Sequence, residues 1–266
     1  MPGSDKEQAV EGIPAATIVI FRNAPAGEPE GAPPQILMTI RSRKLAFAGG
    51  MAVFPGGRVD EADRVLARQL AHDLPDDDEA AHRIAALRET LEETGLAIGI
   101  DQPMSAEQAH EARAMLLEKE DFAPVLDRFG WTLRLGEVLP FARWFPQNEK
   151  LSRVFDTRFY LYDIGTGAVD IEVDKSENSR LFWTSAQGAL DMASEGEIGL
   201  IFPTRRNLER LAQFGDFTAA RADCEAHPVK TIVPFVTEED GVPHIRFGND
   251  HGYPVTGEPL TSAQRG

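Results

Sequence analysis

Three glutamates stand close together in the segment Arg88-Glu89-Thr90-Leu91-Glu92-Glu93-Thr94-Gly95-Leu96. Glu89, Glu92 and Glu93 occupy positions i, i+3 and i+4, so on a helix their side chains share one face. Carboxylates held this close repel one another, and a hard divalent cation bound by oxygen atoms offsets that repulsion. The spacing therefore predicts a helix-borne site for Mg²⁺ or Mn²⁺.

The helix that carries these glutamates has clear start and stop signals. Asp76 followed by Glu79 is typical of a capping box, so the helix is expected to begin near residue 77. Gly95 provides a left-handed stop after Thr94. Apolar residues at helical spacing predict a buried face roughly opposite the glutamates, made of Ile84, Leu87 and Leu91.

Two segments before this helix are also suited to a site. In Phe54-Pro55-Gly56-Gly57, the paired glycines let the backbone adopt positive φ and approach a ligand closely. The run Arg41-Ser42-Arg43-Lys44 gathers positive charge, which makes it a candidate contact for phosphate. A solvated turn explains the basic run equally well.

Strand and helix patterns are mixed along the chain without regular alternation, which predicts an α+β fold with a mixed sheet. Strand-like segments lie at 15–21, 35–41, 51–54, 96–100, 131–135, 138–144 and 157–162, and most are rich in β-branched or aromatic residues. Segment 171–174 precedes an acidic and polar loop at 175–179, and 181–183 is apolar again. Helical patterns lie near 65–70, 105–128 (divided by Pro124), 185–193, 204–214 and 216–226. Segments 231–236 and 242–247 flank an acidic turn and predict a hairpin.

The composition limits the class of partner. The 266 residues include 27 basic and 43 acidic side chains, for a net charge of −16. A basic surface favours nucleic acid and anionic membranes, so neither is expected as a partner. A small anionic substrate remains compatible, because a metal ion and a few arginines can reverse the field in one cleft.

Several features favour a soluble protein in a reducing compartment, and a cytoplasmic location is expected. Cys224 is the single cysteine, so an intrachain disulfide cannot form, and the thiol is expected to be an apolar filler. The first twelve residues lack the pattern of a signal peptide. The longest apolar run, from Ile13 to Phe21, is too short to span a bilayer.

The glutamate segment resembles the signature of the Nudix hydrolase family, G-x5-E-x7-R-E-U-x-E-E-x-G-U, in which U is a bulky aliphatic residue. The second half matches at Arg88, Glu89, Glu92, Glu93, Gly95 and Leu96, while Thr90 stands at an aliphatic position. The first half matches at Gly57. Gly57 and Arg88 are 31 positions apart where the signature has 14, so 17 residues are inserted. The upstream acid of the signature is either Asp63 or Glu79.

Long insertions here are typical of a Nudix branch that includes a peroxisomal coenzyme A diphosphatase of mammals. The upstream pattern of coenzyme A-cleaving members, L-L-T-x-R-S-x-x-L-R-x-H-x-G-Q-V-x-F-P-G-G, also aligns without a gap. Matching positions are Leu37, Thr39, Arg41, Ser42, Leu45, Gly50 and Phe54 to Gly57. Three polar positions differ, because Ala46, Ala48 and Met51 replace arginine, histidine and glutamine.

The resemblance implies an α/β/α sandwich in one domain over residues 13–255. Insertions are expected at about 64–78 and 102–130, flexible tails at 1–12 and 256–266, and a helical and hairpin extension near the C-terminus. Family members are often dimers, so a homodimer is one expectation. The implied reaction is hydrolysis of the pyrophosphate bond in a nucleoside diphosphate linked to another moiety, such as coenzyme A or an acyl derivative.

The resemblance also implies roles for individual residues. Glu89 or Glu92 is the expected base, and Arg88 orients the acids. Expected metal ligands are Glu89, Glu92, Glu93, the carbonyl of Gly56 and a late carboxylate, Glu177, with Asp174 as the alternative. Expected substrate contacts are Arg41, Gly57 and Arg158. The alternatives are an ADP-ribose or NADH pyrophosphatase, and a Nudix-fold module that binds a nucleotide without cleaving it.

Overall fold

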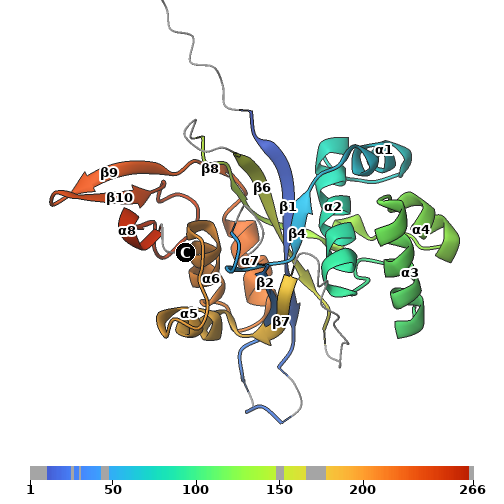
Figure 1. Cartoon of the computed structure of the whole chain (residues 1–266), viewed down its shortest axis with the longest axis horizontal. Helices are drawn as coiled ribbons and strands as arrows, with labels where there is room; N and C mark the ends of the chain where they lie inside the picture. Colours follow the sequence, from blue (N-terminus) through green and yellow to red (C-terminus); the bar gives the residue numbers. More distant parts are fainter. Residues whose placement is uncertain are drawn as a thin grey trace, which may run out of the picture.

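A mixed β-sheet lies between two layers of helices in the computed structural model (Figure 1), which describes residues 11–24, 27–29, 31–42, 48–147, 153–165 and 178–263. The strands run in the order β3-β2-β1-β6-β5-β8, with β4 paired to β1 and β7 paired to β2. Their bounds are β1 Ile13–Arg22, β2 Gln35–Arg41, β3 Ala52–Val53, β4 Gly56–Arg58, β5 Leu139–Trp144, β6 Phe155–Asp163, β7 Asn178–Thr184 and β8 Thr231–Ile232. The expected α+β fold with a mixed sheet is confirmed.

Strand β1 is the centre of this sheet. It runs parallel to β6 from Ile13 to Phe21 and antiparallel to β2 and β4. Six of its ten residues are buried, in keeping with a strand covered on both faces. Apolar residues form one core cluster on each side of the sheet, and the two clusters are the interiors of the two helical layers.

The first layer contains α1 Glu61–Gln69, α2 Asp77–Thr94, α3 Ala106–Lys119 and α4 Ala123–Phe129 (Figure 1). Helix α2 has the predicted bounds: the Asp76 side chain accepts a hydrogen bond from the Glu79 amide at 2.7 Å, and Gly95 closes the helix with φ of 75°. Pro124 lies in the first turn of α4, where its missing N–H costs nothing. Helices α1, α3 and α4 occupy the two regions expected to hold insertions.

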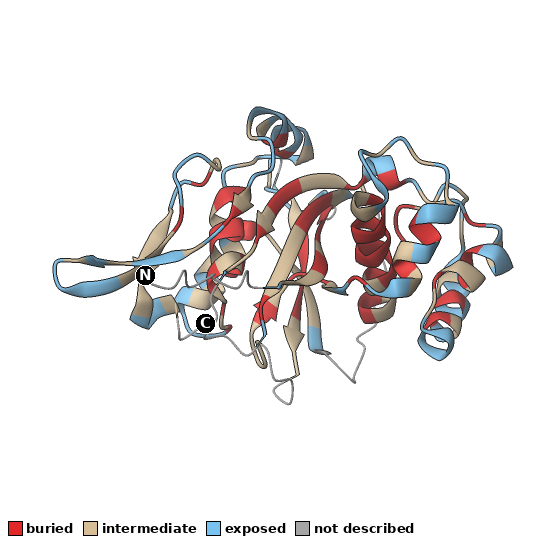
Figure 2. Ribbon diagram, turned by 90° about the horizontal axis from the view of Figure 1, so that it is seen from above, coloured by how far each residue is buried: buried red, intermediate tan, exposed pale blue. Residues whose placement is uncertain are grey.

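Helix α2 is buried on more sides than the sequence pattern predicts. The stripe of Ile84, Leu87 and Leu91 is at most 1% exposed, as expected. The acidic side is covered too, and Glu93 is only 3% exposed. Figure 2 shows this helix coloured as buried along most of its length. Glu93 therefore lies inside the layer formed with β1 and β4, whereas the side chains of Glu89 and Glu92 remain 14% and 20% exposed.

Two predicted strands are wrong. Segments 96–100 and 131–135 meet through a single bridge between Ile100 and Leu133, supported by backbone hydrogen bonds such as Arg134 N to Gly99 O. One bridge cannot propagate into a ladder, because the chain turns into the short 3₁₀ helix η1, Leu135–Glu137, directly afterwards. Segment 171–174 lies outside the described residues.

The second layer contains α5 Ala186–Ser194, α6 Phe202–Leu211 and α7 Phe217–Ala226. A smaller sheet, in the order β11-β10-β9, is formed by β9 Phe235–Glu239, β10 Val242–Arg246 and β11 Gly257–Pro259, and α8 Leu260–Ala263 follows it. Asp240 and Gly241 have φ of 51° and 78°, as tight hairpin turns require, so the predicted hairpin is confirmed.

The expected flexible tail after residue 255 is corrected. Strand β11 pairs with β10, and Glu258 forms an ion pair with the buried Arg206 of α6 at 2.9 Å. Backbone hydrogen bonds and a buried charge pair hold this segment on the body of the molecule. Residues 1–10 lie outside the described part of the chain.

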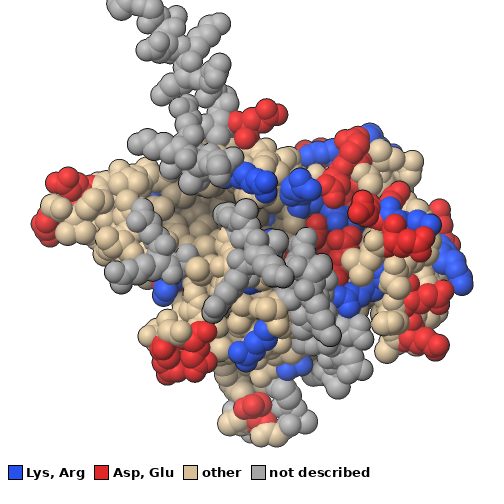
Figure 3. Space-filling view, in the orientation of Figure 1, with Lys and Arg blue, Asp and Glu red and all other residues tan. Residues whose placement is uncertain are grey.

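Charged side chains of both signs lie on the surface of the first helical layer (Figure 3). Acidic and basic side chains are intermixed over the α1–α4 layer on the face shown in Figure 3. In the described ranges, no helix combines the length and the apolarity that crossing a membrane requires.

Candidate active site

Gly56 and Gly57 are the first two residues of β4, and each lies against a glutamate of α2. The Gly56 amide donates a hydrogen bond to Glu93 Oε2 at 3.1 Å, which fixes one carboxylate against the start of β4. Gly56 has φ of 152°, and a Cβ atom there would lie 2.6 Å from the Thr17 Cα on β1. Only glycine fits this position, as the close approach of two backbones requires.

Gly57 lies directly beneath the Glu89 carboxylate. A Cβ atom at Gly57 would collide with this carboxylate, with Oε2 2.7 Å away and Oε1 nearer still. The lack of a side chain at Gly57 therefore leaves space for the Glu89 carboxylate, whereas at Gly56 it leaves space for the backbone of β1. This contact joins the two ends of the predicted motif across the 17 inserted residues.

Arg88 is the hub of the acidic cluster, and its side chain is 5% exposed. Its Nε and Nη2 donate to the two oxygens of Asp63 at 2.9 and 3.0 Å, a bidentate pair. Its Nη1 donates to Glu89 at 3.0 Å and to Glu92 at 3.2 Å. The backbone carbonyl of Arg58 also accepts from Nη2 at 2.9 Å.

These contacts decide between the two upstream acids left open by the sequence. Asp63 is 1% exposed and faces Arg88 from the first turn of α1. Glu79 instead forms ion pairs with Arg83 at 2.9 Å and with Arg158 at 2.7 Å. Asp63 is therefore the acid that pairs with the arginine of the motif, and its position six residues after Gly57 already matched the signature.

Burial and mutual repulsion perturb the glutamates. Burial raises the pKa of Glu89 to about 8, Arg88 opposes this rise, and the charges of Glu93 and Glu92 add to it. Burial likewise raises the pKa of Glu92. For Arg88, burial alone would lower the pKa, but the hydrogen bond to Asp63 and the nearby carboxylates raise it. An added cation would stabilise the ionised form of these carboxylates, because its positive charge offsets their mutual repulsion.

The chemistry of the donor set fits a hard divalent ion, since such ions take carboxylate and carbonyl oxygens. Within the described ranges, no group of three or more acidic, histidine or cysteine side chains is arranged so that it could hold a metal ion. The reason is visible in the contacts: Glu89 and Glu92 turn toward Arg88, and Glu93 turns toward the Gly56 amide. Glu177 and Asp174, the late carboxylates, lie outside the described residues.

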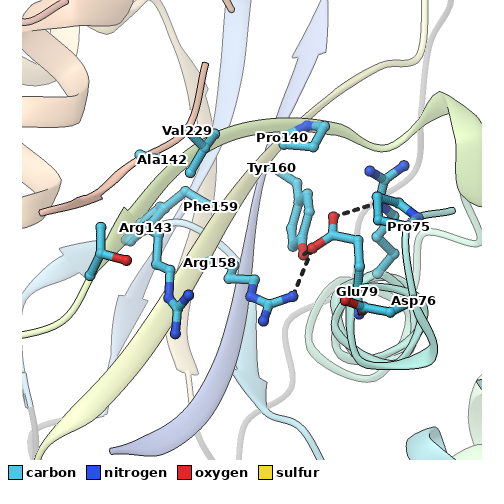
Figure 4. Close-up of a pocket in the computed structure, with 12 residues that line it drawn as sticks. Pro75, Asp76, Glu79, Pro140, Ala142, Arg143, Arg158, Phe159, Tyr160 and Val229 are labelled. Carbon is cyan, nitrogen blue, oxygen red and sulfur yellow. Dashed lines mark hydrogen bonds and ion pairs between the residues drawn. The ribbon is translucent and has the colours of Figure 1, made fainter. Parts of the chain in front are cut away.

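Arg158 lies away from the glutamates. It forms ion pairs with Asp78 and Glu79 in the first turn of α2, and Glu79 is ten positions, or about 15 Å, before Glu89 along the helix. There it lines a pocket of about 280 Å³ together with Arg143 and Tyr160, shown in Figure 4. The structure does not bring this predicted substrate contact to the acidic cluster.

Arg41 ends β2 at a register shift of the β2–β7 ladder. Its Nε is buried and has no hydrogen-bond partner among the residues that the structure describes. One supporting residue has no sequence signal: Arg113 of α3 donates from Nε to the carbonyl of Glu92 at 3.0 Å. Twenty-one positions separate these residues, and no local pattern links them.

Comparison with known proteins supports the motif-based resemblance. No protein-family profile matches the sequence. A Nudix hydrolase from Alicyclobacillus acidocaldarius is 25% identical, with a TM-score of 0.67 over 80% of this chain and 96% of that one.

Two further solved structures show lower similarity. The NUDIX domain of Shewanella oneidensis NrtR, complexed with ADP ribose, is 13% identical with a TM-score of 0.40, over 77% of this chain and 89% of that one. A MutT protein from Methanosarcina mazei Go1 is 15% identical with a TM-score of 0.40, over 77% and 97%. By the similarity to the Alicyclobacillus structure, this chain belongs to the Nudix hydrolase superfamily.

Proposed function

We propose that the chain is a metal-dependent hydrolase that cleaves the pyrophosphate bond of a nucleoside diphosphate linked to another moiety. The observation that carries this proposal is the joint arrangement of Arg88, Glu89 and Glu92 against Gly57. A structural salt-bridge network would not need two carboxylates with raised pKa values beside a glycine turn. Perturbed carboxylates of this kind are typical of catalytic sites.

The residues that would hold the metal are Glu89, Glu92 and Glu93, with the Gly56 carbonyl and Glu177 as further oxygen donors. When bound there, Mg²⁺ or Mn²⁺ neutralises the charge of the pyrophosphate and lowers the pKa of a bound water. Glu93 is held by the Gly56 amide, which keeps a carboxylate beside the glycine turn.

Arg88 is assigned as the orienting residue. Its Nη1 donates to both Glu89 and Glu92, and Asp63 anchors the guanidinium from the other side. Either Glu89 or Glu92 accepts the proton of the attacking water on a carboxylate oxygen. The acceptor must be ionised to do so, and the positive charge of Arg88 favours that form.

Coenzyme A or an acyl derivative is the proposed substrate, from the resemblance of residues 37–57 to coenzyme A-cleaving members. Arg41 is the proposed phosphate contact. Cleavage of coenzyme A would release 3′,5′-ADP and phosphopantetheine. If only ADP-ribose or NADH is hydrolysed, the coenzyme A assignment is wrong while the hydrolase assignment stands.

The test is a turnover assay of purified protein with coenzyme A, ADP-ribose and NADH, with Mg²⁺ or Mn²⁺. Glu92→Gln preserves side-chain size and removes the charge, so turnover should fall by about 10²- to 10⁴-fold. Glu61→Gln is the matched control, because Glu61 lies on the exposed side of α1 with its side chain 74% exposed. Unchanged turnover in Glu92→Gln would refute the assignment, and so would nucleotide binding without any hydrolysis by the wild type.

A further inference from the structure

The C-terminal end of α2 concentrates negative charge. The dipoles of the helix backbone leave a partial negative charge at this end, and the side chains of Glu92 and Glu93 add two carboxylates to it. The last turn, Leu91 to Thr94, contains no basic side chain. A positive charge that offsets this end of the helix therefore has to come from another element.

The Glu92 carbonyl in that turn also needs a hydrogen-bond donor. The Leu91 carbonyl accepts from the Gly95 amide at 3.0 Å, which closes the helix. The next amide along the chain, that of Leu96, donates to Thr94 Oγ1 at 3.1 Å instead of to the Glu92 carbonyl. The last four carbonyls of an α-helix have no partner inside it, so caps and neighbouring groups supply one. The Glu92 carbonyl therefore depends on a donor from outside α2.

Arg113 of α3 supplies this donor. Its Nε donates to the Glu92 carbonyl at 3.0 Å, and the residue is 8% exposed. Helix α3 packs against α2 (Figure 1), and its buried residues are Ala112, Arg113 and Leu116. Ala112 and Leu116 are completely buried in the core cluster of this layer. These apolar neighbours hold α3 in place, so the guanidinium group is fixed at the end of α2.

The start of α3 is fixed by its own sequence. The Ser105 hydroxyl accepts from the Gln108 amide at 3.2 Å, and the Gln108 side chain accepts from the Ser105 amide at 2.9 Å. This capping box sets where the helix begins and hence which of its residues face α2. Helix α3 lies in the region 102–130 that was expected as an insertion, so the inserted segment brings its own folding signals and one charged donor.

The bond from Arg113 fixes the backbone from which two expected metal ligands project. The Glu92 carboxylate accepts from Arg88 Nη1 at 3.2 Å, and Glu93 Oε2 accepts from the Gly56 amide at 3.1 Å. Those two bonds hold side chains, whereas the Arg113 bond holds the main chain. Helix ends fray where their terminal carbonyls lose their partners. Fraying of this turn would move both carboxylates away from the glycine turn.

We propose that Arg113 is a positioning residue of the candidate active site, which holds the last turn of α2 helical and thereby keeps Glu92 and Glu93 beside the glycine turn. This inference rests on the proposed function, which assigns these glutamates to the metal ion. Residues that orient metal ligands without binding the metal change its affinity about 10- to 100-fold when they are replaced. The insertion that carries α3 is therefore part of the support of the site.

The test is binding of Mn²⁺ to the full chain without substrate, measured by electron paramagnetic resonance. Arg113→Lys keeps the positive charge but places a methylene group where Nε donates, so the affinity for Mn²⁺ should fall about tenfold. Arg113→Met also removes the charge. By electrostatics alone this loss favours binding of a cation, whereas loss of positioning should again weaken it. Wild-type affinity in Arg113→Lys, or tighter binding in Arg113→Met, would overturn the proposal.

Arg83→Lys is the matched control. Arg83 is buried on α2, nine positions before Glu92 or about 14 Å along the helix. Its Nη1 donates to the Leu135 carbonyl at 2.8 Å, so it also holds a main-chain oxygen of a neighbouring segment. This variant should lower the melting temperature yet bind Mn²⁺ within about twofold of wild type, because it is distant from the glutamates. Equal losses of Mn²⁺ affinity in Arg83→Lys and Arg113→Lys would mean that Arg113 acts through overall stability, and the proposal would be wrong.

Turnover of coenzyme A, ADP-ribose or NADH separates this inference from the proposed function. In Arg113→Lys the Mn²⁺ concentration at half-maximal turnover should rise about tenfold, whereas KM for the nucleotide at saturating Mn²⁺ should stay within about twofold. If Glu92→Gln loses turnover while Arg113→Lys matches wild type, only the positioning role fails. If wild type binds Mn²⁺ but hydrolyses none of the three nucleotides, the proposed function fails, and the binding assay still decides whether Arg113 positions the glutamates.

Discussion

Arg88 shows how a single buried cation organises its surroundings. Three carboxylates, from Asp63, Glu89 and Glu92, accept hydrogen bonds from one guanidinium group that is 5% exposed. A lysine ammonium is compact and lacks the planar fork that holds Asp63 through two parallel bonds. Arginine is therefore required here by geometry as well as by charge.

Replacing Asp63 by Asn should destabilise the protein by about 3 kcal/mol, because it leaves Arg88 buried with a neutral partner in place of its bidentate one. The change is measured as the free energy of unfolding in urea. Glu61→Gln, two residues away in an exposed ion pair with Arg68, should change it by less than about 0.5 kcal/mol. Equal effects of the two substitutions would contradict the role assigned to the Asp63–Arg88 pair.

Gly57→Ala places a methyl group where the Glu89 carboxylate lies. Turnover should fall at least tenfold, because Glu89 must move away from the glycine turn and misplaced catalytic groups lose rate steeply. Gly136→Ala is the control, since a Cβ atom there meets nothing within 4 Å. Full activity of Gly57→Ala would show that the close contact between Gly57 and Glu89 is not needed for catalysis.

Among the single elements, helix α2 carries two separate groups of charged residues, one on each half. Its C-terminal half carries Arg88 and the glutamates, while its first turns carry Asp78, Glu79, His82 and Arg83 next to the pocket lined by Arg158. The cap at Asp76 and the stop at Gly95 were both encoded locally, as was the buried stripe of the helix. The partners of its acidic side come from β4 and α1, across the insertion.

The buried His82 of α2 should make the free energy of unfolding depend on pH. Burial lowers its pKa, and the charge of Arg158 acts in the same direction, while Nδ1 donates to the Asp78 carbonyl at 2.7 Å. A histidine with a lowered pKa in the folded state binds protons more readily when unfolded. The free energy of unfolding should therefore fall as the pH decreases from about 7 to 5, by up to about 1.4 kcal/mol per pH unit.

His82→Gln should flatten this dependence, as measured by urea unfolding at several pH values. The exposed His110 offers a control, because His110→Gln should leave the slope unchanged. A wild-type slope that persists in His82→Gln would assign the effect to other groups.

At the scale of the whole molecule, the C-terminal segment completes the second core cluster. Phe247 is 2% exposed and its ring lies 4.9 Å from that of Trp144 on β5. Tyr253 donates from its hydroxyl to Asn207 Oδ1 on α6 at 2.6 Å. Residues more than a hundred positions apart thus form one interior, which supports the proposal of a single domain over residues 13–255.

Phe247→Ala should lower the free energy of unfolding by about 3–5 kcal/mol and leave one cooperative transition, monitored by tryptophan fluorescence and circular dichroism. Phe235→Ala, on the hairpin with its residue 52% exposed, should change it by less than about 0.5 kcal/mol. A separate early transition that involves only the C-terminal segment would refute the single-domain proposal.

Most regular elements could be predicted from the sequence, because caps, glycine stops and apolar periodicity act within a few residues. The bounds of α2 and the hairpin at Asp240-Gly241 are examples. The strands predicted at 96–100 and 131–135 were wrong, since strand formation depends on a partner of sufficient length, and a single bridge joins them.

The sequence by itself determined the chemistry of the site: three glutamates at helical spacing, an arginine beside them and a glycine pair upstream. Only the tertiary structure decided which acid joins Arg88 and that Arg158 pairs with Asp78 and Glu79, in the first turn of α2, instead of reaching the glutamates at its other end. The physical reason is that spacing along one helix is local, whereas ion pairs and strand register join residues through the fold.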